Sequence, residues 1–190
     1  MQRADLPASL RQFVDTVSKL LETESNEQRF LPKIGESMRR LVADDDWLDP
    51  AFAEPDPEHY RQYLLYADPD DRFSVVSFVW GPGQETPIHD HMVWGVIGML
   101  RGAEITQGYE IGFDGKPNPT GAAIRLSPGA VEFVSPAIGD VHKVRNALME
   151  QASISIHAYG ANIGTVERHV FPPEGGAAKK FVSGYSNAQP

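Results

Sequence analysis

The sequence predicts a mainly β fold, an antiparallel β-barrel or sandwich with a helical layer at its N-terminus. From about residue 72 the chain consists of short segments rich in β-branched and aromatic residues, separated by Gly, Pro, Asp and Asn; examples are FSVVSFVW, WGVIGML and AVEFV. This pattern is typical of short antiparallel strands. Before about residue 50 the apolar residues instead follow the spacing of amphipathic helices. Neither part contains an internal repeat.

Two helices are expected in residues 1–50. Apolar residues that share one helix face are Leu10, Phe13, Val14, Val17, Leu20 and Leu21 in the first, and Phe30, Leu31, Ile34, Met38 and Leu41 in the second. Ser9 followed by Gln12 predicts a capping box at the start of the first helix. The charged stretch DDDWLDP ends the helical part. We interpret both apolar stripes as core packing.

The whole chain, residues 1–190, is expected to form one domain, because its length suits a single core. The helical layer occupies residues 1–50 and the barrel about residues 60–171. Residues 172–190 form a C-terminal tail that is expected to be loosely ordered at its end.

Composition narrows the classes of function. The net charge of −9 makes a nucleic acid or an anionic membrane surface a poor partner. The absence of cysteine excludes disulfides, thiolate zinc sites and cysteine nucleophiles. The first residues lack the features of a signal peptide and no apolar run is long enough to span a membrane, so a cytoplasmic location is expected. Nothing in the sequence indicates the oligomeric state.

Three histidines lie in segments that are expected to be strands. Alternate residues of a strand share a face, so His89 and His91 should project together, with Asp90 turned away. His142 follows a Gly-Asp turn and can enter the barrel from another strand. Three neutral imidazoles inside one barrel can share a metal ion. The alternative is that each histidine is an ordinary core residue.

The spacing around these histidines favours a metal site. The pattern Gly83-x5-His89-x-His91-x3-Gly95-x6-Gly102 resembles the first cupin motif, except that this motif carries glutamate where the chain has Gly95. The pattern Pro136-x2-Gly139-x2-His142-x3-Asn146 resembles the second. The resemblance implies a cupin-type jelly roll. Without the acid, the ion would have three neutral ligands and about three free positions. Ligand types alone leave zinc open as well.

The segment SISIHAY places Ser155, His157 and Tyr159 on one strand face and apolar residues on the other. Two interpretations fit this alternation. The strand can be half exposed, with its polar face in water. Alternatively, the polar face points inward and forms a chain of hydrogen bonds that aims the tyrosine hydroxyl at the metal.

Together, PIHDH, DVHKVRN and SISIHAY resemble the cysteine dioxygenase family, the thiol dioxygenases of the cupin superfamily, from about Tyr60 to Phe171. The resemblance implies a mononuclear Fe(II) held by His89, His91 and His142. It further implies a catalytic relay of Ser155, His157 and Tyr159. The reaction would add both atoms of O₂ to a thiol and yield a sulfinic acid.

At two positions the chain differs from the mammalian enzymes of this family, and these differences indicate which branch it resembles. Gly95 occupies the position of the cysteine that is cross-linked to tyrosine in the mammalian enzymes, so Tyr159 cannot be cross-linked. Gln62 stands where those enzymes carry a carboxylate-binding arginine. The chain thus resembles the bacterial Gln-type branch, typified by 3-mercaptopropionate dioxygenase, which implies that Arg168 binds the substrate carboxylate with help from Gln62. From the residues alone, the favoured interpretation of Arg168 is a surface ion pair with Glu167 or another acid.

The sequence therefore predicts an Fe(II)-dependent thiol dioxygenase whose partners are O₂ and a small thiol carboxylic acid. The first choice of substrate is 3-mercaptopropionate. The alternatives are cysteine or mercaptosuccinate as substrate at the same site. Outside the oxygenases, a zinc- or nickel-dependent isomerase or hydrolase, or a cupin that senses small molecules or stores metal, remain as other classes.

Overall fold

The computed structural model describes residues 3–187. Two α-helices, α1 (Ala8–Thr23) and α2 (Glu27–Leu41), precede a series of short strands. The strands are β1 (Arg61–Ala67), β2 (Ser74–Trp80), β3 (Ile88–His89), β4 (Gly95–Arg101), β5 (Glu104–Ile111), β6 (Pro117–Pro119), β7 (Ile124–Leu126), β8 (Val131–Val134), β9 (His142–Asn146), β10 (Ser153–Tyr159), β11 (Arg168–Phe171) and β12 (Lys179–Phe181). Single turns of 3-10 helix occur at Arg3–Asp5, Pro50–Phe52 and Ile163–Thr165.

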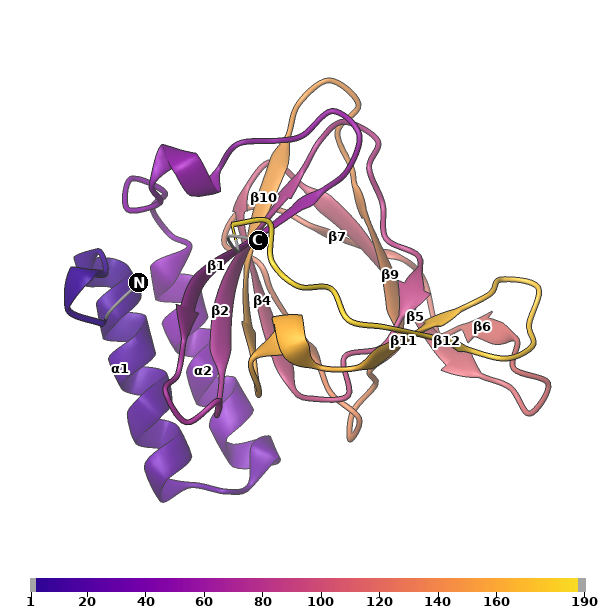
Figure 1. The fold of residues 1–190 in the computed structure, drawn as a ribbon, viewed down its shortest axis with the longest axis horizontal. Coiled ribbons are helices and arrows are strands. Elements are labelled where there is room, and N and C mark those ends of the chain that lie inside the picture. Colours follow the sequence, from indigo (N-terminus) through magenta and orange to yellow (C-terminus); the bar gives the residue numbers. More distant parts are fainter. Residues whose placement is uncertain (1–2, 188–190) are drawn as a thin grey trace.

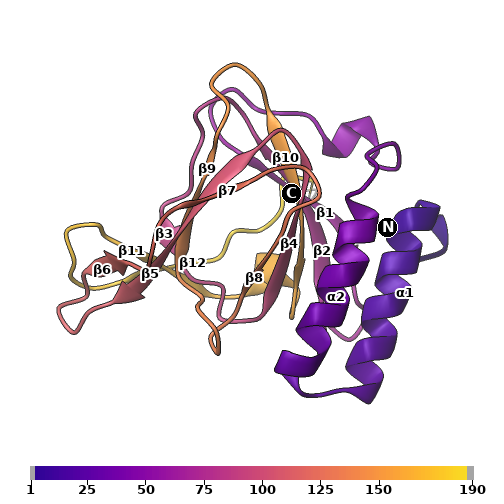
Figure 2. The ribbon, with the colours of Figure 1, turned by 180° about the vertical axis from the view of Figure 1, so that it is seen from behind.

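The strands form two antiparallel sheets that curl against each other into a barrel (Figure 1). The first sheet has the order β1-β2-β10-β4-β8, and the second has β12-β11-β3-β9-β5-β6, with β7 also paired to β5. Both helices lie side by side on the outer face of the first sheet, as the view from behind also shows (Figure 2). The prediction of a mainly β fold with an N-terminal helical layer is confirmed.

The first sheet is buried on both faces because the helices cover the side that would otherwise meet water. In β10, Ile154, Ile156 and Ala158 pack into the cluster that contains the helix residues Ile34 and Met38. The intervening residues of this strand are buried as well and face the barrel interior. Full burial of an aliphatic side chain of this size contributes about 1.5–3 kcal/mol, so the helical layer is a major part of the core.

The helices follow the predicted stripes, but the first helix begins differently from the prediction. The predicted capping box at Ser9 is wrong, because α1 starts at Ala8 after Pro7 and no side chain caps it. Pro7 itself occupies the N-cap position, and its side chain has no oxygen that could accept a hydrogen bond from the first N–H groups. Helix α2 has the usual arrangement, in which the Asn26 side-chain oxygen accepts a hydrogen bond from the Gln28 N–H at 3.0 Å.

The C-terminal tail crosses the barrel and returns to the edge strand β1 (Figure 1). The Ser186 N–H donates to the Gln62 carbonyl at 2.8 Å, and the Leu64 N–H donates to the Asn187 side chain at 2.9 Å. These bonds satisfy backbone groups that an edge strand otherwise leaves free. The expected loosely ordered end, residues 188–190, lies outside the described residues.

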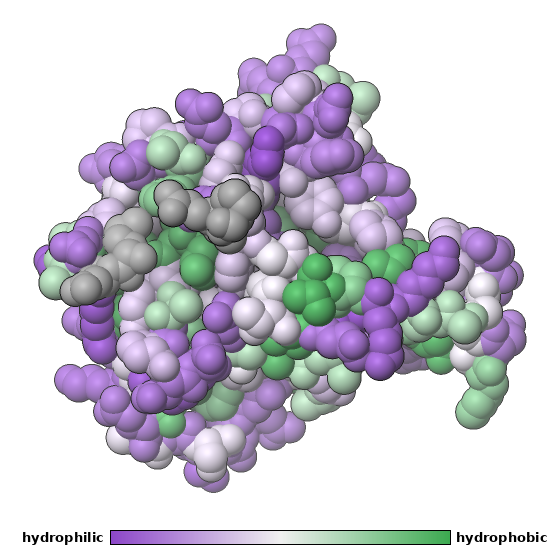
Figure 3. Space-filling model, in the orientation of Figure 1, coloured by the Kyte–Doolittle hydropathy of each residue, from purple (hydrophilic) through white to green (hydrophobic). Residues whose placement is uncertain are grey.

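The face that carries this tail is mostly hydrophilic, with smaller apolar patches between the polar residues (Figure 3). None of the described helices is both long and apolar enough to cross a membrane.

Candidate metal centre

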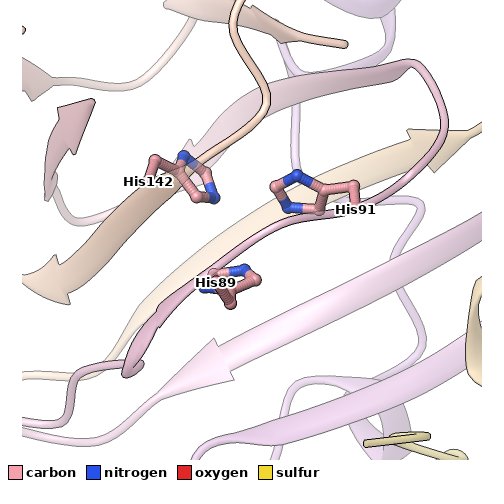
Figure 4. Close-up of side chains that lie close together, drawn as sticks. All are labelled: His89, His91 and His142. Carbon is pink, nitrogen blue, oxygen red and sulfur yellow. The ribbon is translucent and has the colours of Figure 1, made fainter. Parts of the chain in front are cut away.

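The three histidines converge inside the barrel (Figure 4). His89 on β3 and His142 on β9 are direct partners across these antiparallel strands, and His91 follows β3 in the chain. Their ring centroids are 4.8–4.9 Å apart, and one nitrogen from each ring lies within 4.8 Å of the others. All three side chains are buried. The arrangement is a three-histidine cluster that can hold a metal ion.

His91 reaches the cluster by a different route from the predicted one. Strand β3 ends at His89, so the two histidines do not share a strand face. Asp140 holds His91 instead: its carboxylate accepts hydrogen bonds from the backbone N–H groups of His91 and Met92, at 3.1 and 2.8 Å. Asp90 does turn away from the cluster, and its carboxylate accepts the His169 backbone N–H at 2.7 Å.

Contacts behind the rings orient the nitrogens that face the cluster. The Nδ1–H of His89 donates to the Pro87 carbonyl at 3.1 Å, and that of His91 faces the carboxylate and the carbonyl of Asp140 at 3.0 and 3.1 Å. Both partners only accept, so Nδ1 carries the proton and Nε2 keeps a free lone pair. For His142, Nδ1 lies 3.3 Å from the Thr106 hydroxyl.

The chemistry of this donor set fits a metal ion. Burial, followed by the neighbouring His91, lowers the pKa of His89 to about 3, and burial also lowers the pKa of His142. These rings are therefore neutral ligands at ordinary pH. Within residues 3–187, the buried Nε2 of His91 has no hydrogen-bond partner, which is unusual for a polar atom unless an ion occupies the site. The cluster formed by these residues contains no carboxylate.

The packing around position 95 explains why the chain has glycine there and not the acidic residue of the first cupin motif. It lies opposite Tyr159 in the pair β4–β10. A Cβ atom at this position would come within 2.9 Å of the Tyr159 ring and within 2.7 Å of a Val134 methyl group. Glycine thus provides the space that the tyrosine ring occupies, and a carboxylate could enter only if that ring moved.

Ser155, His157 and Tyr159 form a continuous chain of hydrogen bonds inside the barrel. Ser155 Oγ lies 2.7 Å from His157 Nε2, and His157 Nδ1 lies 2.8 Å from the Tyr159 hydroxyl. The half-exposed alternative is wrong for this strand, because every residue of β10 is buried. The Tyr159 ring stacks on His91 at 5.3 Å between centroids, so the chain ends beside the histidine cluster. Burial raises the pKa of Tyr159, which therefore keeps its proton.

Arg168 is a buried cation near this cluster. Only 3% of it is exposed, and its guanidinium donates to the Ser183 hydroxyl at 2.6 Å and lies over the Phe181 ring at 4.7 Å. The alternative of an ion pair with Glu167 does not occur, since Glu167 pairs with Lys180 at 2.7 Å. The charge of Arg168 contributes to the lowered pKa of His89. Among the described residues, its buried Nε has no partner, so it can bind an anion.

Gln62 is buried on β1 and contacts the same serine. Its side-chain amide donates to the Ser183 hydroxyl at 3.0 Å and to the Gly184 carbonyl at 2.8 Å. Both amide hydrogens are therefore directed at the C-terminal segment. Ser183 links Gln62 to Arg168, a connection that sequence reasoning missed because nothing in the tail distinguishes this serine from its neighbours.

Comparison with known proteins bears on the fold. No family model matches the chain. A protein with a double-stranded β-helix domain from Klebsiella pneumoniae is 17% identical, with a TM-score of 0.51 over 68% of this chain and 99% of that one. A cupin superfamily protein from Desulfitobacterium hafniense is 13% identical over 57% of this chain and 84% of its own length, with a TM-score of 0.44. An RmlC-like cupin from Desulfovibrio desulfuricans is 24% identical over 57% and 88%, with a TM-score of 0.43.

The first of these likenesses shows the fold alone, a double-stranded β-helix. The fold and the histidine cluster together define a cupin-type barrel with a three-histidine site that can hold a metal ion.

Proposed function

We propose that this protein is an Fe(II)-dependent thiol dioxygenase that converts 3-mercaptopropionate to its sulfinic acid. The observation that supports this best is the placement of a buried three-histidine cluster beside a buried hydroxyl chain, with a buried arginine near His89. The reaction R–SH + O₂ → R–SO₂H balances without a further reductant, so a chain without a nucleotide or flavin motif suffices.

His89, His91 and His142 are the residues that would hold the iron. A ferrous ion held by these residues would supply the redox chemistry that a reaction between a thiol and O₂ needs. Three uncharged ligands leave the full positive charge of the ion available to stabilise a thiolate. The chemistry of the donors thus suits a substrate that must lose its thiol proton.

Arg168 binds the carboxylate of the substrate in this proposal. A guanidinium can hold a carboxylate by two parallel hydrogen bonds, which fixes orientation as well as affinity. The Ser183 hydroxyl accepts from Arg168 and from Gln62, so the two side chains are positioned together. Gln62 therefore contributes by holding Ser183 and, through it, the guanidinium.

Tyr159 supplies a hydrogen bond to the reacting groups. Its hydroxyl is held by His157, and His157 by Ser155, so that its direction is set before substrate binds. A preorganised donor of this kind stabilises negative charge that develops on sulfur or oxygen without any rearrangement of solvent. The reaction is proposed to take place in the cytoplasm, on a small soluble thiol.

Oxygen uptake by defined metal forms tests the proposal. Protein stripped of metal is reloaded with Fe(II), Zn²⁺ or Ni²⁺ and supplied with 3-mercaptopropionate, cysteine, mercaptosuccinate or cysteamine, and the product is identified by mass spectrometry. We expect uptake only with Fe(II), fastest with 3-mercaptopropionate, and a product heavier by two oxygen atoms. Faster turnover of cysteine or mercaptosuccinate would overturn the substrate assignment, and a preference for cysteamine would overturn the role of Arg168. Activity restored by Zn²⁺ or Ni²⁺ would overturn the reaction itself.

A further inference from the structure

Glu104 is a buried acid inside the barrel that the proposed reaction does not use. It is the first residue of β5, its exposure is 1%, and neither of its carboxyl oxygens makes a hydrogen bond of normal geometry within residues 3–187. Burying a carboxyl group without partners is costly, so such a residue calls for an explanation. Sequence reasoning passed over it because a single acid in a predicted strand carries no motif.

The surroundings of Glu104 connect it to the hydroxyl chain. The Ser155 hydroxyl and the Trp80 indole lie near enough to its carboxyl group to lower its pKa, while burial, the larger influence, raises that pKa to about 8. The Trp80 indole also donates to Ser155 Oγ at 3.3 Å. Glu132 on β8 is the other charged group that acts on Glu104, and it raises the pKa further. The carboxyl group therefore lies near the Ser155 end of the chain, opposite to Tyr159, but not at hydrogen-bond distance in this structure.

We propose that Glu104 is a positioning residue that sets the direction of hydrogen bonding along Ser155, His157 and Tyr159, so that its proton decides whether the tyrosine hydroxyl donates or accepts. The numbers of hydrogens and lone pairs on Ser155 and His157 limit the hydrogen bonds that these two residues can make. Ser155 has one hydrogen and two lone pairs, and one lone pair is taken by Trp80. Neutral His157 has one N–H and one free lone pair on its two nitrogens.

With Glu104 protonated, its O–H donates to Ser155, Ser155 donates to His157 Nε2, and the His157 Nδ1–H donates to the Tyr159 oxygen. The hydrogen of Tyr159 is then free to donate to a group in the barrel. With Glu104 ionised, Ser155 donates to the carboxylate, His157 carries its proton on Nε2, and the Tyr159 hydroxyl donates to His157 Nδ1. Tyr159 can then only accept. Once the carboxyl group comes within hydrogen-bond distance of Ser155, either state pairs Glu104, Ser155 and His157, so the proton on Glu104 selects between them.

The consequence for catalysis, which rests on the proposed function, is that only the protonated state presents a donor to the reacting groups. The hydrogen-bond direction itself depends on neither metal nor thiol. It is visible in His157, whose tautomer differs between the two states. Burial lowers the pKa of His157 and raises that of Tyr159, so neither group changes its own charge near pH 8.

Nitrogen-15 NMR of metal-free protein with labelled histidine tests this inference directly. Spectra are recorded from about pH 6 to about pH 10, which brackets the Glu104 pKa of about 8. His157 signals are assigned by their absence from His157→Gln. We expect the Nδ1–H tautomer at low pH and the Nε2–H tautomer at high pH. Glu104→Gln, which cannot ionise, should fix one tautomer at every pH.

Glu132→Gln is the matched control, because it removes the other buried acid and leaves Glu104 in place. It should keep the tautomer change, with a midpoint at slightly lower pH. A single His157 tautomer across the whole range in the wild type would overturn the inference, as would an unchanged transition in Glu104→Gln. A tautomer change in a protein that oxidises no thiol would contradict only the proposed function, since these spectra require neither iron nor substrate.

Discussion

His89 and His142 are direct partners across β3 and β9, although they are far apart in the sequence. Backbone pairing therefore places two imidazoles side by side, and the side chain of Asp140 brings the third ring to them. The cluster depends on closure of the barrel rather than on any local segment. This dependence explains why the ligands can be preorganised by the fold before a metal binds.

Replacing His142 by alanine should abolish stoichiometric iron binding and leave the fold intact. Loss of an outer partner of a ligand typically costs about 10–100-fold in metal affinity, so loss of a ligand is expected to cost more than about 100-fold. Iron content after dialysis and a binding titration measure the effect. His59→Ala is the control, because His59 is exposed. Equal iron content in the two variants would show that the cluster does not bind the metal.

Tyr159→Phe should slow turnover by about 10- to 1,000-fold, the range up to the loss of one preorganised donor. Iron content should not change, since Tyr159 is not one of the three candidate ligands. Tyr63→Phe is a matched control, because the hydroxyl of Tyr63 donates to the Glu54 carbonyl at 2.8 Å, away from the cluster. Steady-state oxygen uptake measures both. Turnover as fast as that of the wild type would remove Tyr159 from the mechanism.

Arg168→Lys should lower kcat/KM for 3-mercaptopropionate by about 10–100-fold, because a hydrogen bond to a charged group contributes about 1.5–3 kcal/mol and lysine cannot form the paired contact. The rate with cysteamine, which has no carboxylate, should not fall. Arg101→Lys serves as the control, since Arg101 pairs with Asp45 at the surface. An equal loss for both thiols would mean that Arg168 supports the structure and does not recognise the carboxylate.

Much of the fold could be predicted because the residue types and their spacing indicate most of its helices and strands. The short β-branched segments predicted the strands of the barrel, and the apolar stripes predicted α1 and α2. Strand β1 is the exception, because RQYLLYA has no β-branched residue and alternates poorly; its pairing with β2 overrides this weak preference. The start of α1 was mispredicted because Pro7 occupies the N-cap position and cannot provide a side-chain cap.

The residues of the candidate site could be predicted better than the contacts that hold those residues in place. Spacing singled out the three histidines and the polar face of β10. It could not show that Asp140 holds His91, that Ser183 links Arg168 to Gln62, or that Glu104 adjoins Ser155. Each of these contacts joins segments that only the closed barrel and the returning tail bring together. Such residues carry no local pattern, so they become visible only in three dimensions.

The stability of the protein should depend on pH through Glu104. The folded protein retains the proton of this carboxyl up to a pKa of about 8, whereas the unfolded chain releases it near the ordinary value of 4.5. Between these values the folded state binds more protons than the unfolded state, so the free energy of unfolding falls as pH rises, by up to about 1.4 kcal/mol per unit. Glu104→Gln removes this contribution, since the amide does not ionise.

Urea unfolding of the wild type and Glu104→Gln at about pH 5.5 and about pH 7.5 measures the difference. The wild type should lose on the order of 2 kcal/mol more than the variant over this interval. Glu132, with a pKa raised to about 7 by burial, contributes a slope of the same sign; because it interacts with Glu104, the same comparison is repeated in Glu132→Gln, where that slope is absent. Parallel pH profiles would mean that Glu104 titrates as an ordinary carboxyl and that the folded barrel does not hold its proton.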